Sequence, residues 1–254
     1  MTSEPGAKEA RGPRPACGSE STASATELKQ ELGALVRAVS HDFRAPLRAI
    51  TTFGGLLQEQ SGQLEGPLAE SVGHMVLAAT RLESMVEGWL ALARADDGSP
   101  PVDVALDTVL QAVRRRVEPI VVERKGTLTL QPLGIVVGQP APLTRLFDAL
   151  VDNALTFTHA PPVVVVEGRT EGAFHVVTVR DEGIGFEPQH ESRIFELFQR
   201  LHTAEEFPGV GAGLAVSKKI AELHGGRITA TSSLGDGAVF EVWLPTGAAP
   251  QTAP

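Results

Sequence analysis

Apolar and polar residues alternate with two different periods along the chain. Between residues 28 and 94, apolar residues recur every three or four positions, which is typical of long amphipathic helices. From residue 102 onwards, apolar runs of strand length alternate with helical periods, which indicates mixed α and β structure. Residues 97–101 have the sequence DGSPP, lie between the two regions and predict a linker.

The first region predicts two long antiparallel helices. A capping box of Ser24 and Glu27 precedes the first helix, and glycines at residues 62–67 mark the turn into the second, which runs from about Pro67 to Arg94. The apolar positions of the first helix are Leu28, Leu32, Leu35, Val39, Phe43, Leu47, Ile50 and Leu57. Those of the second helix alternate steps of four and three, and are Leu68, Val72, Met75, Ala79, Leu82, Val86, Trp89 and Ala93.

Each predicted helix carries one apolar seam, and an isolated hairpin cannot bury both seams. Two hairpins can bury them as a four-helix bundle, so the pattern predicts a homodimer built on residues 26–96. The alternative is a hairpin that packs on the C-terminal part of its own chain. Residues 1–25 are rich in Pro, Gly, Ala and Ser and predict a disordered tail, and Pro-rich residues 248–254 predict a frayed end.

The second region, residues 102–247, predicts an α/β sandwich with a mixed sheet. Strands are expected at residues 102–104, 127–130, 135–137, 163–167, 176–179, 228–231 and 239–244, and helices at residues 107–117, 143–157, 191–198 and 214–223. The expected fold class of the whole chain is therefore α+β, with a helical hairpin followed by a sandwich domain.

Composition narrows the class of protein. With 42% apolar residues the chain can bury a sizeable core, and a net charge of −9 opposes non-specific nucleic-acid binding, which needs a basic surface. A single cysteine excludes an internal disulfide framework and a cysteine-based zinc site. No apolar run approaches the ~18–20 residues that cross a bilayer, so we expect a cytoplasmic protein with no nucleic-acid partner and no membrane insertion.

His41 is the first residue with candidate chemistry, in the sequence SHDFRAPL. It lies two positions after Val39, about 200° round the helix, and therefore points away from the seam into solvent. An exposed imidazole is a usable nucleophile near neutral pH, and the adjacent Asp42 can fix its tautomer. Pro46 and a local stutter in the apolar spacing predict mobility around it. A lone exposed histidine is more often an ordinary surface residue, which is how we interpret His74, His159, His175, His190 and His202.

Two short patterns further along the chain suggest a nucleotide site. Asn153 lies late in a predicted helix and offers a neutral oxygen that suits Mg²⁺. Asp181 directly follows a predicted strand and is followed by Gly183 and Gly185, which allow a planar ligand to approach the backbone closely. A carboxylate there accepts the exocyclic amine of adenine and repels the carbonyl oxygen of guanine. Taken alone, Asn153 is interpreted as an ordinary helix-surface residue, and the Asp181 segment is as consistent with a plain turn as with a site.

Gly209, Gly211 and Gly213 open a predicted helix with Leu214, and glycine-rich backbone at a helix N-terminus suits phosphate oxygens. The segment lacks the lysine of a P-loop. Its glycine spacing and the loop before it also differ from the dinucleotide-binding fingerprint. The P-loop fold and the dinucleotide-binding fold are both disfavoured by these differences.

The order of these patterns resembles the transmitter module of two-component sensor histidine kinases, over residues 27–246. Residues 40–47 resemble the H box, 146–157 the N box, 181–185 the first G box, 194–200 the F box, 209–214 the second G box and 233–240 the last. Residues 198–226, with FQRLH and AELHGG, are most similar to phytochrome-like members.

The resemblance implies a dimeric four-helix hairpin bundle followed by a Bergerat-type ATP-binding domain. The implied roles are phosphoacceptor for His41, activating carboxylate for Asp42, Mg²⁺ ligand for Asn153, adenine recognition for Asp181, pocket lining for Gly183 and Gly185, ATP lid for Gly209, Gly211, Gly213 and Leu214, lid hinge for Phe195 and Phe198, and phosphate approach for Arg200. The implied function is ATP-dependent autophosphorylation of His41, followed by transfer to an aspartate of a response regulator. The segment before residue 27 is too short for a sensor domain, so a separate sensory or regulatory protein is expected.

Three positions depart from the family pattern. Ala149 replaces an asparagine and Thr156 a lysine, which removes polar groups near Mg²⁺ and phosphate and predicts slow turnover. Ala45 stands four residues after His41, where many members have Thr or Asn, and predicts weak or absent phosphatase activity toward the partner.

The alternative function is a catalytically weak or inactive pseudokinase that serves as an ATP-binding dimeric scaffold for a receiver domain. ATP-hydrolysing relatives and anti-sigma-type serine kinases fit less well, since the former lack the helical hairpin and the latter the H box. The input signal, the cognate regulator and the choice between cis and trans phosphorylation are left open by the sequence.

Overall fold

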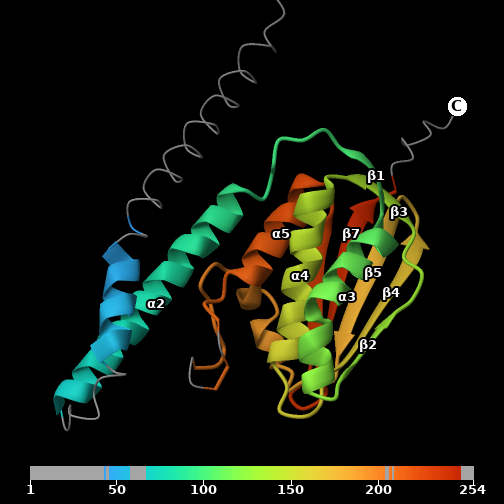
Figure 1. Ribbon diagram of the computed structural model, residues 1–254. Helices are drawn as coiled ribbons and strands as arrows, with labels where there is room; N and C mark the ends of the chain where they lie inside the picture. Colours follow the sequence, from blue (N-terminus) through green and yellow to red (C-terminus); the bar gives the residue numbers. More distant parts are fainter. Residues whose placement is uncertain (1–42, 44–45, 58–66, 204–205, 208, 247–254) are drawn as a thin grey trace, which may run out of the picture.

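A computed structural model of the chain describes residues 43, 46–57, 67–203, 206–207 and 209–246. Figure 1 shows a pair of helices beside a layered α/β domain. Residues 46–57 are helical, and α2 spans Pro67–Ala93, as the apolar spacing predicts for the second helix. The two helices pack closely where Gly54 faces Val76, because a Cβ at Gly54 would overlap the Val76 side chain. Most of the predicted first helix, and the predicted turn before Pro67, lie outside the described residues.

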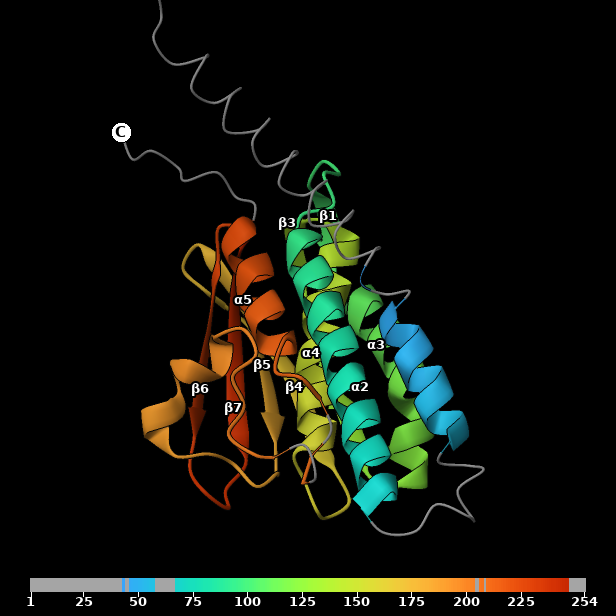
Figure 2. The same ribbon diagram turned by 90° about the vertical axis from the view of Figure 1, so that its left-hand side faces the viewer.

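The α/β domain contains a five-stranded mixed sheet in the order β2-β4-β5-β7-β6, and β1 and β3 form a separate antiparallel pair. Only β2 and β4 pair in parallel within the larger sheet. The strands are β1 Val102–Ala105, β2 Thr127–Leu130, β3 Ile135–Gly138, β4 Val163–Glu171, β5 Phe174–Asp181, β6 Arg227–Ser232 and β7 Ala238–Pro245. The helices are α3 Leu106–Glu123, α4 Pro140–Thr156 and α5 Gly213–Leu223, and Figures 1 and 2 show them together on one face of the sheet.

The core lies between these helices and the sheet. Alternate residues of β7 point inward, so Phe240, Val242 and Leu244 are fully buried. From the helical layer, Phe147 and Leu150 of α4 are also fully buried. This packing fixes the position of α4 and of the C-terminal end of β5, both of which carry predicted site residues.

Within the described residues, the predicted strands and helices are present, and one segment was assigned the wrong type of structure. The predicted helix at residues 191–198 is wrong: residues 188–195 contain two short 3₁₀ turns instead, η1 Pro188–His190 and η2 Arg193–Phe195. The chain turns Ile194 and Phe195 into the core and then becomes extended at Glu196, which ends the helical conformation. The predicted helix at residues 107–117 is longer than expected and continues to Glu123, past Pro119.

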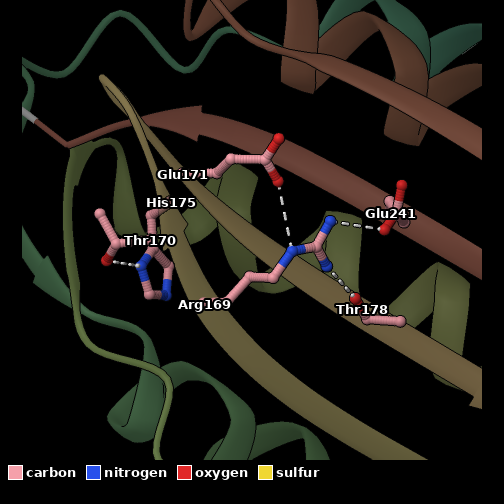
Figure 3. A network of polar contacts seen from close by, with 6 residues as sticks. All are labelled: Arg169, Thr170, Glu171, His175, Thr178 and Glu241. Atoms are coloured by element: carbon pink, nitrogen blue, oxygen red, sulfur yellow. Dashed lines mark hydrogen bonds and ion pairs between the residues drawn. The ribbon is translucent and has the colours of Figure 1, made fainter.

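The opposite face of the sheet is covered by long side chains of its own strands, as Figure 3 shows for Arg169. The Arg169 guanidinium bonds to Glu241 at 2.8 Å and to the Thr178 hydroxyl at 3.1 Å. Arg227 lies over the Trp243 ring, 3.8 Å from its centroid. Cation–π contacts of this kind cover apolar ring surface and keep the charges in water.

The segment between α2 and β1 is tied to α4. The Gln139 side chain donates to Asp96 Oδ1 at 3.0 Å and to Ser99 O at 2.6 Å. Arg145 of α4 donates to the carbonyl of Arg94 at 2.7 Å, and Ala95 is buried in the core of the α/β domain. The start of the predicted linker at residues 97–101 is therefore anchored, while its assignment as a linker stays a prediction. In the described part of the chain, no helix is both long enough and apolar enough to cross a membrane.

Candidate functional site

A cavity of about 370 Å³ lies between α4, the C-terminal end of β5, the loop that follows the 3₁₀ turns, and the start of α5. This volume falls in the range of small-molecule sites. Eight of the predicted site residues line it: Asn153, Asp181, Gly185, Arg200, Gly209, Gly211, Gly213 and Leu214. The folded chain thus brings together residues separated by up to 61 positions of sequence, from Asn153 to Leu214.

Asp181 is the buried carboxylate of the cavity, with 6% of its surface exposed. Its Oδ1 accepts hydrogen bonds from Gly183 N at 2.9 Å and Ala238 N at 3.2 Å, which fix the orientation of the carboxylate. Burial raises the pKa of Asp181, and these two backbone hydrogen bonds oppose the rise. Within the described chain both hydrogen bonds fall on Oδ1, so Oδ2 is the oxygen suited to a ligand.

Gly183 and Gly185 have different structural roles. A Cβ at Gly183 would collide with the carbonyl oxygen of Phe157, so this glycine permits the close approach of two backbone segments, and it lies behind the cavity rather than in its lining. Gly185 lines the cavity with φ +62°, and a Cβ there would collide with Ser233 O. Both positions therefore require glycine.

The glycine-rich segment leads directly into α5. Gly211 has φ +74°, accepts a hydrogen bond from Phe198 N at 2.9 Å, and has no room for a Cβ beside Gln199 O. Gly213 is the first residue of α5, whose N-terminal N–H groups carry partial positive charge. Positive-φ backbone next to a helix N-terminus is a suitable site for phosphate oxygens.

The last turns of α4 form another wall of the cavity. Asn153 is half-buried there, and Asp152 beside it bonds to Arg116 at 2.8 Å. Ala149 adds only a methyl group to the wall. The Thr156 hydroxyl donates to Asp152 O at 2.7 Å, so its proton is used inside the helix.

Arg200 lines the cavity and is held by the loop after it. Its Nη2 donates to Thr203 O at 2.7 Å and to Phe207 O at 2.5 Å. Its burial and the nearby charge of Arg81 both lower the pKa of Arg200. The guanidinium is therefore positioned by two neutral carbonyl groups.

The remaining predicted site residues lie elsewhere. Phe195 is buried in the core, and Phe198, with φ +64°, packs against Trp89 of α2 with ring centroids 6.4 Å apart. Neither phenylalanine lines the cavity. His41 and Asp42 lie outside the described residues.

Sequence reasoning missed an aromatic cluster beside the cavity. Phe157, at the end of α4, lies 5.1 Å from Phe207, which also contacts His202 at 5.4 Å and His159 at 5.0 Å, all between ring centroids. Phe157 and His202 line the cavity, although His202 had been interpreted as an ordinary surface histidine. Its place in the FQRLH segment was the available signal.

A second missed residue is His224, in the AELHGG segment. Its Nε2 accepts a hydrogen bond from Gln139 N at 2.9 Å, and its Nδ1 bonds to Ile220 O at 2.8 Å. One tautomer, with the proton on Nδ1, satisfies both contacts. His224 thus joins the C-terminus of α5 to the N-terminus of α4 and holds two walls of the cavity together.

Family models place this architecture in a known class. Residues 138–248 match the Histidine kinase-, DNA gyrase B-, and HSP90-like ATPase domain, and residues 31–98 match the His Kinase A (phospho-acceptor) domain. The first match covers four of the five strands of the larger sheet, β4 to β7, together with α4, α5 and every residue that lines the cavity. The C-terminal part is therefore an ATPase domain of this class, which binds ATP.

Individual relatives extend the similarity to both domains. Cyanobacterial phytochrome A of Nostoc sp. is 35% identical over 225 residues, which are 85% of this chain and 29% of that protein. Sensor protein KdpD of Escherichia coli is 30% identical over 238 residues, 91% of this chain and 26% of that protein. The chain thus spans less than a third of the length of these curated relatives.

Two solved structures are similar to this chain in fold. Full-length ShkA in complex with AMPPNP has a TM-score of 0.60 at 26% identity, over 85% of this chain and 47% of that chain. Histidine kinase AdeS of Acinetobacter baumannii shares the fold, with a TM-score of 0.56 at 20% identity over 82% of this chain and 98% of that chain. The chain belongs to the two-component histidine kinases and is a transmitter module with a phosphoacceptor domain and an ATPase domain.

Proposed function

We propose that this module autophosphorylates His41 with ATP and passes the phosphoryl group to an aspartate of a response-regulator receiver domain. The observation that carries the proposal is the cavity, which combines a buried carboxylate with a glycine-rich segment at a helix N-terminus. A carboxylate at Asp181 selects adenine over guanine. Backbone N–H groups of residues 209–213 and of the first turn of α5 suit the phosphates.

The cavity also fits Mg²⁺ bound together with ATP. Among the described residues, no three His, Cys, Asp or Glu side chains gather to hold a metal. Mg²⁺ in nucleotide sites keeps several waters and takes one or two protein ligands in addition to phosphate oxygens. We assign Asn153 as the protein ligand, because its amide lies in the cavity wall. When bound, the ion neutralises phosphate charge and orients the γ-phosphate.

The proposed transfer forms a bond between an imidazole nitrogen of His41 and the γ-phosphorus. The bond from that phosphorus to the β–γ bridging oxygen breaks, and ADP leaves. The Asp42 carboxylate fixes the tautomer of the His41 imidazole by accepting a hydrogen bond from the ring nitrogen that does not attack. Arg200 and the start of α5 stabilise the negative charge of the phosphates.

The proposed assembly is a homodimer through the helical hairpin. On α2, Met75, Leu82 and Trp89 are 59%, 52% and 52% exposed and lie seven residues apart. On the first helix, Phe43, Ile50 and Leu57 have the same spacing and are 55%, 41% and 48% exposed. Two apolar stripes with heptad spacing suit a second copy of the same hairpin.

The remaining partners follow from the proposed chemistry. A receiver domain takes the phosphoryl group from His41, and a sensory or regulatory protein supplies the input. Low phosphatase activity is proposed from Ala45, which provides no polar group to position water. Brisk dephosphorylation of a cognate receiver, lost in Ala45 variants, would contradict that point.

The experiment that tests the function is incubation of the full chain with γ-labelled ATP and Mg²⁺, beside a His41→Gln variant. The expected result is acid-labile, base-stable label on the unmodified chain and none on the variant. Label that persists in His41→Gln would remove His41 as the phosphoacceptor.

An ATP-binding scaffold without autophosphorylation is the second candidate. It is favoured by the cavity wall, where Ala149 offers no polar group and the proton of the Thr156 hydroxyl is engaged with Asp152 O. Measured ATP binding without any label would select this candidate. Restoring the family residues with Ala149→Asn and Thr156→Lys should then restore labelling.

A further inference from the structure

The two residues whose carbonyl groups hold Arg200 are themselves joined by a hydrogen bond. Arg200 Nη2 donates to the carbonyl oxygens of Thr203 and Phe207, and Phe207 N donates to the same Thr203 O at 3.2 Å. Thr203 N also donates to the Glu206 carboxylate at 3.0 Å. A guanidinium donates from the fixed positions of a planar fork, so the place of these two carbonyl groups decides where Arg200 points.

The aromatic ring of Phe207 anchors this pair of carbonyl groups. Phe207 is 5% exposed, and its ring centroid lies 5.1 Å from that of Phe157, 5.0 Å from that of His159 and 5.4 Å from that of His202. Contacts between rings at such distances add to the stabilisation that comes from buried area. The hydrogen bonds of Thr203 to Arg200 and Glu206 are exposed, where water competes for the same groups. Burial of the ring is therefore the stronger constraint on the Phe207 carbonyl.

The anchor is attached to a fixed part of the ATPase domain. Phe157 is the residue that ends α4, and its carbonyl oxygen accepts a hydrogen bond from Ile184 N at 2.9 Å. Gly183 packs against the same carbonyl so closely that a Cβ would collide with it. The Phe157 ring is thus carried by backbone that is tied to the segment after β5. Through this ring, Phe207 connects the end of α4 to Arg200.

We propose that Phe207 is a positioning residue for the phosphate end of the ATP site and acts through Arg200. The proposal rests on the function proposed above, and it adds a residue that none of the six box segments contains. Burial of the ring fixes the Phe207 carbonyl, and the carbonyl orients the guanidinium toward the phosphates. Because a free arginine side chain has many rotamers, holding it in place before ATP arrives raises the affinity. Phe207 is not among the residues that line the cavity, so its effect on ATP is indirect.

The test compares the affinities of the full chain for ATP and for adenosine in the presence of Mg²⁺, measured by competition with a fluorescent ATP analogue. Phe207→Ala should weaken ATP binding roughly tenfold and leave adenosine binding within about twofold, because adenosine has no phosphates to meet Arg200. Phe207→Leu keeps apolar bulk without the ring and should give a smaller loss of ATP affinity. Phe174→Ala is the matched control and should change neither affinity, since this ring packs on Trp243 away from the cavity.

A double-mutant cycle separates action through Arg200 from a general loosening of the site. Arg200→Gln should itself weaken ATP binding, and adding Phe207→Ala to it should change the ATP affinity by less than about twofold. If Phe207→Ala does not fold, the same comparisons are made with Phe207→Leu.

Three results would overturn the role of Phe207 while the ATP site itself would stand. They are an unchanged ATP affinity in Phe207→Ala, equal losses of ATP and adenosine affinity in that variant, and a full additional loss when Phe207→Ala is combined with Arg200→Gln. Failure of the unmodified chain to bind ATP would overturn the proposed function and this role together.

Discussion

Helices α2 and α4 are both amphipathic, and their apolar faces have different surroundings. Every core-facing side chain of the central turns of α4 is buried, with Leu146, Phe147 and Leu150 at 0% exposure. On α2, Ala79 and Leu90 are buried, while Leu82 is half-exposed. The apolar face of α4 is completed by its own sheet, and that of α2 is only partly covered by its own chain.

The two parts of the molecule also differ in their buried polar groups. Among the described residues, the buried polar side chains all belong to the ATPase domain: Thr158, His175, Thr178, Asp181 and Ser217. Burying a polar group costs free energy unless it is hydrogen-bonded, and a rigid core keeps the hydrogen-bond partners in place. The helical part has apolar surface to cover instead. This difference supports the proposed dimer: the core of the ATPase domain is complete within one chain, whereas the hairpin leaves apolar surface for a second copy.

The largest expected effect comes from breaking the completed core. Leu150→Ala removes a fully buried side chain and should destabilise the ATPase domain by about 2–5 kcal/mol. Thermal unfolding and nucleotide binding measure this. Val122→Ala on the exposed side of α3 is the control, with an expected change within about 0.5 kcal/mol. Equal effects of the two variants would contradict the packing described for α4.

The next effect is loss of the dimer. Leu82→Glu places a charge in the exposed stripe of α2 and should shift the chain to monomer in sedimentation experiments, with ATP affinity unchanged. Leu77→Glu is the matched control, because Leu77 is 54% exposed but lies off the stripe. A dimer that survives Leu82→Glu would place the interface elsewhere.

Asp181→Asn probes the buried carboxylate. The amide oxygen can keep the hydrogen bonds from Gly183 and Ala238, so the fold should persist, while ATP affinity should fall roughly 10- to 100-fold as a charged hydrogen bond is lost. Burial raises the folded-state pKa of Asp181, so the ionised carboxylate lowers stability at neutral pH. The variant should therefore melt higher than the unmodified chain at pH 7, and the difference should shrink as the pH falls through that raised pKa. A lower melting temperature with unchanged affinity would contradict both roles.

The smallest expected effect concerns His175, at the other end of β5. Burial lowers the pKa of His175 and the charge of Asp107 opposes this, while Nε2 is buried without a partner among the described residues. Neutral His175 stabilises the folded state fully at pH values above about 6.5, the pKa of histidine in the unfolded chain. This stabilisation is lost as the pH falls through the lower pKa of His175 in the folded state. His175→Phe should make the decline in melting temperature between pH 7 and 5 shallower. An unchanged slope would show that other groups dominate acid unfolding.

Much of the ATPase domain could be predicted because its elements have strong local signals. Strand β2 was predicted at residues 127–130, where the structure has it, and α4 was predicted to within three residues at each end. The 3₁₀ turns at residues 188–195 were not, because the burial of Ile194 and Phe195 decides their conformation. A tertiary contact there overrides a helical spacing.

The site residues also divide into those that local sequence reveals and those that only the folded chain brings together. Asp181 and the glycines were found from sequence because adjacent residues define them. The cluster of Phe157, His202 and Phe207 was missed because its members approach one another only in the folded chain.

The order of strands has a consequence for how the cavity forms during folding. Strands β4 and β5 are joined by a tight turn at Gly172, and such local hairpins form within microseconds. Strands β5 and β7 are also neighbours, but residues 182–237 separate them, including the glycine-rich segment and α5. The entropy of closing this loop is lost before the pairing of β5 and β7 offsets it, so this pairing is expected to form more slowly than the local hairpin. The nucleotide site is therefore assembled late, and ATP acts on the folding equilibrium by holding the finished domain rather than by guiding the early steps.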